Sequence, residues 1–290
     1  YDESKWRKDY SQYLKWKDYL IDRNLEKDIL DKYEEVKINA QKETMKKQDQ
    51  NRELLKKIRN SARFEGLQDK LIDSIEKLNR DNPIVITPNT SPHKEDKEGL
   101  VLFSDWHFGM EIDNRVNKFN KEVFIDRVNK LVDKTIYYGK KNEIQKLNVA
   151  NLGDLLSGLI HVSTRVQSNE NVIEQITFVS ETLAEILGTL SSTFEEVVFY
   201  NICGNHSRVM ANKSDVGIKE NFENIIPWFL QARLSHVKNL TIVNEQDGIA
   251  EAEIYDSKLI LVHGDYDNVQ NSYAKLPQLL GYVPNYIVSG

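Results

Sequence analysis

The stretch GLVLFSDWH, residues 99–107, is the part of the chain that decides the fold. Its first five residues form a short apolar run, which is typical of a buried β-strand. Asp105 and His107 follow directly, two positions apart. On extended backbone, side chains two positions apart point to the same side, so we expect this pair to be able to hold one metal ion together.

The same pattern, an apolar run followed by polar residues, recurs three times along the chain. It is found in LNVANLGD (147–154), VVFYNICGNH (197–206) and LILVHGD (259–265), which supply Asp154, Asn205, His206 and His263. In open α/β sheets the carboxyl ends of the strands converge on one crevice. We therefore expect the polar residues of all four stretches to meet in space.

Stretches with helical periodicity alternate with these strands, at residues 121–138, 170–190 and 219–234. Such alternation predicts an α/β domain over residues 99–290. The Asp256-Ser257 step lies between two strand-like runs and predicts a tight hairpin, so we expect mixed rather than purely parallel sheets.

Residues 1–80 differ from the rest, with one glycine, no proline and apolar residues at helical spacing. They predict two or three helices, arranged as a helical hairpin or a coiled-coil-like arm. The arm would pack as a solvated hairpin on the main domain, mediate homo-oligomerisation or binding of a protein partner, or contact DNA. DNA contact is the least favoured, since 20 Lys and Arg against 17 Asp and Glu is a weak positive charge. Residues 81–98 hold three of the six prolines and predict a linker.

Composition excludes several classes of protein. The single cysteine, Cys203, permits no internal disulfide and no cysteine-based metal site, and it ends an apolar run, so we expect a buried structural thiol. A chain that forms no disulfide fits a reducing cytoplasm. The apolar runs fall far short of the ~20 residues that cross a membrane, so we expect no membrane association.

Carboxylates mixed with imidazoles suit divalent Mn²⁺, Fe or Zn²⁺, with Mn²⁺ the best match and Mg²⁺ an alternative. One carboxylate, such as Asp154, can bridge two cations about 3.5–4 Å apart, and such a pair can clamp both oxygens of an in-line displacement at phosphorus. The metals lower the pKa of a bridging water, so that hydroxide forms near neutral pH. A free histidine near the leaving oxygen can donate the proton.

The order Asp-x-His, Gly-Asp, Gly-Asn-His and His-Gly resembles the motif set of the calcineurin-like metallophosphoesterase superfamily, over roughly residues 99–290. The resemblance implies a four-layer αββα sandwich of two mixed sheets between helices. It also implies a role for each motif residue. Asp105 and His107 would hold the first metal, Asp154 would bridge, Asn205 and His263 would hold the second metal, and His206 would donate the proton.

Two features depart from the family pattern. Ser207 follows the Gly-Asn-His triplet, where an acidic residue normally orients the histidine, so either Ser207 substitutes weakly or another group does this work. The family's last motif, Gly-His-x-His, should follow the apolar run Tyr286–Val288, and the sequence stops at Gly290. Our hypothesis is that the native protein continues with this motif; a protein ending here should bind metal poorly and be nearly inactive.

Three further residues are candidates for substrate contacts. Arg208 is close enough to the Gly-Asn-His triplet to bind phosphate, or it is a surface arginine. His161 and Arg165 follow the Gly-Asp motif, in a position where loops often shape substrate pockets. Alternatively, they are ordinary polar residues at the start of a helix. We interpret His93 and His236 as surface residues.

Three functions remain open from the sequence. The favoured one is a two-metal phosphodiesterase acting on DNA or RNA, similar to the SbcD-type DNA-repair nuclease branch. It is favoured by the helical arm and because GDLLSG, residues 153–158, lacks the Gly-Asp-x-x-Asp-Arg-Gly motif of Ser/Thr protein phosphatases. The alternatives are a phosphatase or phosphodiesterase for a small molecule or nucleotide, and a non-catalytic scaffold that keeps the fold.

Overall fold

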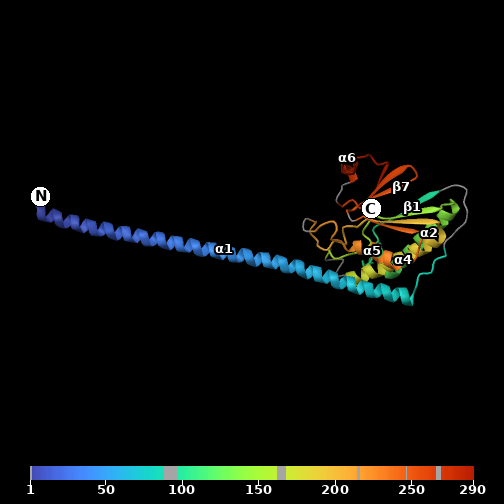
Figure 1. Cartoon of the computed structure of the whole chain (residues 1–290), viewed down its shortest axis with the longest axis horizontal. Helices are drawn as coiled ribbons and strands as arrows, with labels where there is room; N and C mark the ends of the chain where they lie inside the picture. The colour runs from blue at the N-terminus through green and yellow to red at the C-terminus, as the bar shows by residue number, and fades with distance from the viewer. Residues whose placement is uncertain (1, 88–96, 162–167, 214–215, 246, 266–268) are drawn as a thin grey trace. The chain divides into compact units, whose positions relative to one another are not determined.

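The computed structural model describes residues 2–87, 97–161, 168–213, 216–245, 247–265 and 269–290 (Figure 1). The chain divides into two compact units, residues 1–68 and 69–290. The second unit begins ahead of the linker at residues 81–98, where the sequence placed the boundary. Part of that linker, residues 88–96, lies outside the described residues.

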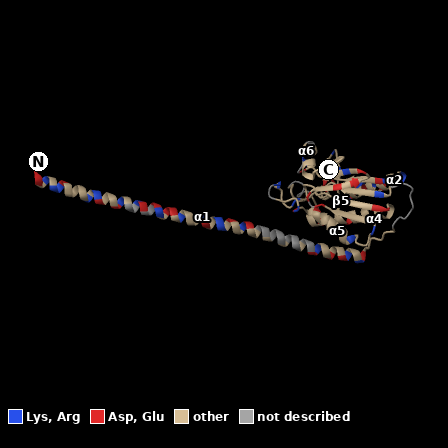
Figure 2. Ribbon diagram, turned by 45° about the horizontal axis from the view of Figure 1, so that its top comes forward, with Lys and Arg blue, Asp and Glu red and all other residues tan. Residues whose placement is uncertain are grey.

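Helix α1 (Glu3–Asp81) is one uninterrupted helix of 79 residues. The expected two or three helices, and with them the helical hairpin, are not what the structure contains. The reason is that the polar stretch between Gln41 and Glu53 consists mainly of good helix formers, and the only glycine, Gly66, weakens a helix by about 1 kcal/mol without ending it. Acidic and basic residues are interspersed along the helix (Figure 2), and Arg7 pairs with Glu3 at 2.9 Å.

The last turns of α1 belong to the second unit. Leu71 and Ile75 are buried in it. The guanidinium of the fully buried Arg233 donates hydrogen bonds to the side chain of Asn79 and to the carboxylate of Glu181. An arginine fork paired in this way fixes two segments with several charge-assisted hydrogen bonds.

The first sheet of the second unit has the strand order β1-β4-β5-β6, and all neighbours are parallel. The strands are β1 (Glu98–Phe103), β4 (Lys146–Asn151), β5 (Glu196–Asn201) and β6 (Leu240–Asn244). Helices α2 (Lys121–Lys141), α4 (Val172–Thr193) and α5 (Ile225–Arg233) connect them, and the short 3₁₀ helix η2 (Phe222–Asn224) precedes α5. The parallel order brings the carboxyl ends of β1, β4 and β5 to one edge.

The second sheet has the order β7-β8-β9 and is mixed. Strands β7 (Ile249–Ile254) and β8 (Ser257–Val262) are antiparallel, and β9 (Tyr286–Ser289) runs parallel to β8. The predicted hairpin is confirmed, with Ile254 paired to Ser257 across the turn. Strands β2 (Ile112–Asp113) and β3 (Lys118–Phe119) form a separate small pair.

The two sheets pack against each other through apolar side chains. One cluster joins β4 and β5 to β7 and β8 and includes Leu152, Tyr200, Ala250 and Leu261. A second cluster joins β8 to helix α6 (Val269–Leu280) through Ile260 and Leu276. The α/β class is thus confirmed, whereas the expectation that both sheets are mixed is wrong for the four-stranded sheet. Within the described residues, no helix has both the length and the apolar character needed to span a membrane.

Candidate metal centre

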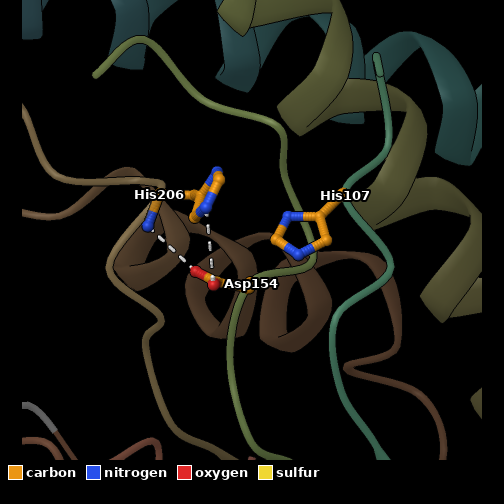
Figure 3. A group of neighbouring side chains, drawn as sticks. All are labelled: His107, Asp154 and His206. Carbon is orange, nitrogen blue, oxygen red and sulfur yellow. Dashed lines mark hydrogen bonds and ion pairs between the residues drawn. The ribbon is translucent and has the colours of Figure 1, made fainter. Parts of the chain in front are cut away.

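Three side chains from three different loops point toward one another at the carboxyl ends of β1, β4 and β5 (Figure 3). They are His107, Asp154 and His206, and one ligand atom of each lies within 4.8 Å of the others. Two of them are imidazoles and one is a carboxylate. Because each comes from a separate sequence motif, the predicted convergence of the motifs is confirmed for these three.

Asp154 is the central carboxylate of the group. It is buried, and its Oδ1 accepts a hydrogen bond from the backbone N–H of His206 at 2.9 Å. Its Oδ2 lies 3.4 Å from Nε2 of His263 and 4.0 Å from Nε2 of His206. Burial by itself would raise the pKa of Asp154, but the hydrogen bonds from His263 and His206 outweigh burial and lower it. Asp154 is therefore a carboxylate with imidazole nitrogens around it.

His263 and Asn205 meet beside Asp154, although they come from different sheets. Nε2 of His263 lies 3.0 Å from Oδ1 of Asn205, and its Nδ1 lies 2.8 Å from the carbonyl oxygen of Leu152. That carbonyl can only accept, so Nδ1 carries a proton and Nε2 faces the two side-chain oxygens. Burial would lower the pKa of His263, but the Asp154 carboxylate raises it to about 9. The raised pKa means that Nε2 binds a second proton in the metal-free protein, and a cation bound at Nε2 would replace that proton.

Asp105 and His107 lie together as predicted, but the backbone reason given for it is wrong. Oδ1 of Asp105 is 3.5 Å from Nε2 of His107, and both residues have positive φ, at 54° and 45°, rather than extended backbone. Their N–H groups donate to the carbonyls of Gly153 and Asp154, so this loop lies against the Gly-Asp turn. Burial lowers the pKa of His107, which keeps its imidazole neutral as a metal ligand must be.

Backbone strain is concentrated at this site. Five described residues other than glycine have positive φ, and three of them are Asp105, His107 and Asp154. Such conformations cost about 1–3 kcal/mol each and persist where the surrounding structure enforces them. Gly204 shows how tight the fit is, because a Cβ there would lie 2.1 Å from Oδ1 of Asp154.

His206 sits between two other imidazoles. Its ring centroid is 4.4 Å from that of His107 and 4.6 Å from that of His161. Its Nδ1 lies 3.3 Å from the carbonyl oxygen of Ser157, so Nδ1 carries a proton and Nε2 is the nitrogen available for chemistry. The geometry allows both the predicted role of proton donor and a role as ligand.

The predicted substrate contacts have different outcomes. His161 lies beside His206, as described above, whereas Arg165 lies outside the described residues. Arg208 is nearly buried and is held by Oδ2 of Asp265 at 3.2 Å and by the carbonyl of Asn205 at 3.2 Å. The neighbouring Lys213 also pairs with Asp265, at 3.3 Å. Arg208 is thus already engaged in joining two loops.

The remaining single-residue predictions concern the surface and the cysteine. His236 is exposed as predicted, and His93 lies outside the described residues. Cys203 is only partly exposed, and its thiol lies 3.0 Å from the side-chain oxygen of Asn224. Burial raises the pKa of this thiol well above its ordinary value, which agrees with an unreactive structural cysteine.

Sequence reasoning missed Glu223. This residue is fully buried in η2 and accepts hydrogen bonds from both motif-bearing turns and from Ser207. Burial raises its pKa above the ordinary value, and the hydrogen bonds it accepts oppose this shift. Its position in the sequence, inside the predicted helix 219–234, gave no signal of a role at the site.

The residues of this centre carry donor atoms that are suited to divalent cations. The group offers carboxylate oxygen, amide oxygen and imidazole nitrogen, a set suited to Mn²⁺, Fe or Zn²⁺. The buried Nδ1 of His107 has no hydrogen-bond partner among the described atoms. Strand β9 also ends here, since a Cβ on Gly290 would lie 2.7 Å from Oγ of Ser104 and 2.6 Å from the carbonyl of Leu152.

No family model matches the chain. The chain is 25% identical over 284 residues to the SPbeta prophage-derived uncharacterized protein YonJ of Bacillus subtilis (strain 168), a match that covers 96% of this chain and 69% of that protein. The function therefore has to be argued from the site.

Proposed function

We propose that this protein is a metal-dependent phosphoric ester hydrolase that cleaves phosphodiester bonds, with DNA or RNA as its substrate. One observation carries the proposal: side chains from three other motifs, each following a strand, gather around Asp154. They arrive in the order that resembles the calcineurin-like superfamily. The same resemblance implies a four-layer αββα sandwich, and the two packed sheets with helices beside them support it.

Each residue has a defined task in this proposal. Asp105 and His107 would hold one cation, Asn205 and His263 a second, and Asp154 would contact both. The cations, when bound, would neutralise charge on the phosphate and lower the pKa of a water molecule that attacks phosphorus. His206 would hold a proton on Nε2 and pass it to the leaving oxygen, while its Nδ1 stays bonded to the carbonyl of Ser157.

The substrate class rests on a charge argument and on the arm. The bound cations would supply the positive charge that residues 81–290, with a net charge of −9, lack. The arm adds only weak electrostatic support for a polynucleotide, because its charges sum to a net +3 over residues 1–80. A single free thiol agrees with a cytoplasmic location.

The test is an assay of the full-length protein with Mn²⁺ against four substrates: bis-p-nitrophenyl phosphate, a panel of mononucleotides, and single- and double-stranded DNA. RNA is assayed alongside. We expect turnover of the diester and of at least one polynucleotide, and none after chelation of the metal. Turnover confined to monoesters would contradict the nuclease assignment. A protein that binds no Mn²⁺ and turns over none of these substrates would instead be a scaffold.

A further inference from the structure

Two turns carry most of the metal centre. Both contain backbone N–H groups that lie beyond the strands and are not paired within the sheet. The first turn follows β4 and contains Asp154; the second follows β5 and contains Asn205 and His206. The ladder between these strands ends at Asn151 and Asn201. Buried N–H groups beyond that point need another acceptor, because an unsatisfied one costs about 1–3 kcal/mol.

Glu223 supplies that acceptor for both turns at once. Its Oε1 accepts from the N–H groups of Leu155 at 2.7 Å and Leu156 at 3.2 Å. The same oxygen accepts from the Ser207 hydroxyl at 2.9 Å, and Oε2 accepts from the N–H of Gly204 at 2.8 Å. Oε1 thus accepts three hydrogen bonds and Oε2 one, a total equal to the number of lone-pair sites of a carboxylate.

Three of the four donors are adjacent in sequence to site residues, and the fourth, Leu156, lies one position further along. Leu155 follows Asp154, Gly204 precedes Asn205, and Ser207 follows His206. A shift of the Glu223 carboxylate would therefore move the bridging carboxylate, the amide and the proton donor together. No other described side chain accepts hydrogen bonds from both turns.

Glu223 is itself held in place from its own segment. Its N–H donates to the side chain of Asn221 at 2.9 Å, and the amide of Asn221 donates in turn to the carbonyl of Gly204 at 2.7 Å. The N–H of Phe222 donates to the carbonyl of Ser207 at 2.9 Å. Glu223 is fully buried, so water does not compete for its oxygens.

We propose that Glu223 is a positioning residue that fixes Asp154, Asn205 and His206 in one geometry, in place of an acidic residue at position 207. The hydroxyl of Ser207 reaches Oε1 of Glu223, so a longer acidic side chain at 207 would put its carboxylate where that of Glu223 lies. This inference rests on the proposed metal-dependent function. Glu223 acts on the backbone of the two turns, whereas the His206 ring itself is held by the carbonyl of Ser157.

The first test is the Mn²⁺ affinity of Glu223→Gln, measured without substrate. An amide at 223 must turn its NH₂ toward at least one of the backbone N–H donors, so we expect affinity to fall about 10- to 100-fold, the usual effect of losing a residue that supports a metal ligand. The matched control is Glu181→Gln, which removes the partner of the buried Arg233 away from the site. It should lower stability and leave Mn²⁺ affinity within about twofold.

The second test moves the carboxylate. The double variant Ser207→Glu/Glu223→Ala keeps the total side-chain volume nearly constant, and it should regain most of the affinity that Glu223→Ala alone loses. A Glu223→Gln protein that binds Mn²⁺ like the wild type would overturn the proposal. So would an equal loss in Glu181→Gln, or a double variant no better than Glu223→Ala.

Two further measurements keep the outcome decisive. If Glu223→Gln does not fold, Ser207→Ala removes one of the four donors and keeps the carboxylate; unchanged Mn²⁺ affinity there would overturn the proposal. If the wild type itself binds no Mn²⁺, the proposed function fails, but amide hydrogen exchange still tests Glu223. The N–H groups of Leu155 and Gly204 should then exchange faster in Glu223→Gln, and unchanged protection would overturn the inference.

Discussion

His263 places its Nε2 3.4 Å from Oδ2 of Asp154, across the contact between the two sheets. Asp154 follows β4 in the parallel sheet, and His263 follows β8 in the mixed sheet. Neither residue could reach the other unless both sheets presented the carboxyl ends of these strands at the same edge. The face-to-face packing of the sheets is thus what assembles the candidate metal centre.

Replacing Asp154 by alanine should have the largest effect of any single change at the site. Asp154 lies within 4.8 Å of a ligand atom of His107 and 3.4 Å from Nε2 of His263, residues proposed for different cations, so its loss removes a contact to each cation. We expect Mn²⁺ content to fall for both sites together and kcat to drop by at least about 10³-fold, roughly 4 kcal/mol of barrier. Elemental analysis and a diester assay measure the two effects. Retention of one full equivalent of metal would show that Asp154 is not shared.

His206→Ala should separate chemistry from metal binding. With the imidazole gone, the leaving oxygen would lack its proton donor, so we expect kcat to fall by about 10²- to 10⁴-fold. Metal content should stay at the wild-type level, because the five residues proposed as ligands do not depend on this ring. A variant stripped of metal would instead make His206 a ligand, which its place beside His107 and Asp154 also allows.

The sequence was sufficient for the parts of the fold that follow from local pattern. Apolar runs ending in Asp105, Asp154 and His263 identified strands and the edge at which they meet. The hairpin was also predicted correctly, although its two turn residues are Tyr255 and Asp256 and Ser257 already belongs to β8.

The sequence-based predictions that the structure contradicts, and the site residue that they missed, have two kinds of physical cause. The arm was expected to contain two or three helices, although the Lys, Glu and Gln of its polar stretch are good helix formers and the helix continues through it. Glu223 was missed because its role depends on a contact between η2 and two distant turns, which no local pattern encodes. The positive φ of Asp105 and His107 likewise depends on the neighbouring Gly-Asp turn.

The metal-free protein should lose stability as the pH rises through the range in which His263 titrates. Its pKa is raised to about 9 in the folded protein, against about 6.5 when unfolded. The pair with Asp154 therefore stabilises the fold fully below pH 6.5, and this contribution, on the order of 3 kcal/mol, disappears as the pH passes 9. Thermal melts in EDTA between pH 6 and 10 measure it. His263→Gln should show a flatter profile, and an identical slope would contradict this account.

The close approach of Gly204 to Asp154 gives a prediction with a matched control. Alanine at 204 would place Cβ 2.1 Å from Oδ1 of Asp154 and 2.1 Å from its backbone nitrogen, so the Gly-Asp turn must move. We expect Gly204→Ala to lower stability by about 1–3 kcal/mol, as overpacking does, and to weaken Mn²⁺ binding at least tenfold. Gly217→Ala is the control, because nothing lies within 4 Å of the Cβ it would add. Chemical denaturation and Mn²⁺ titration of both variants make the comparison. Equal Mn²⁺ affinity in the two would mean that the metal centre tolerates displacement of Asp154, and the tight geometry described here would not matter for binding.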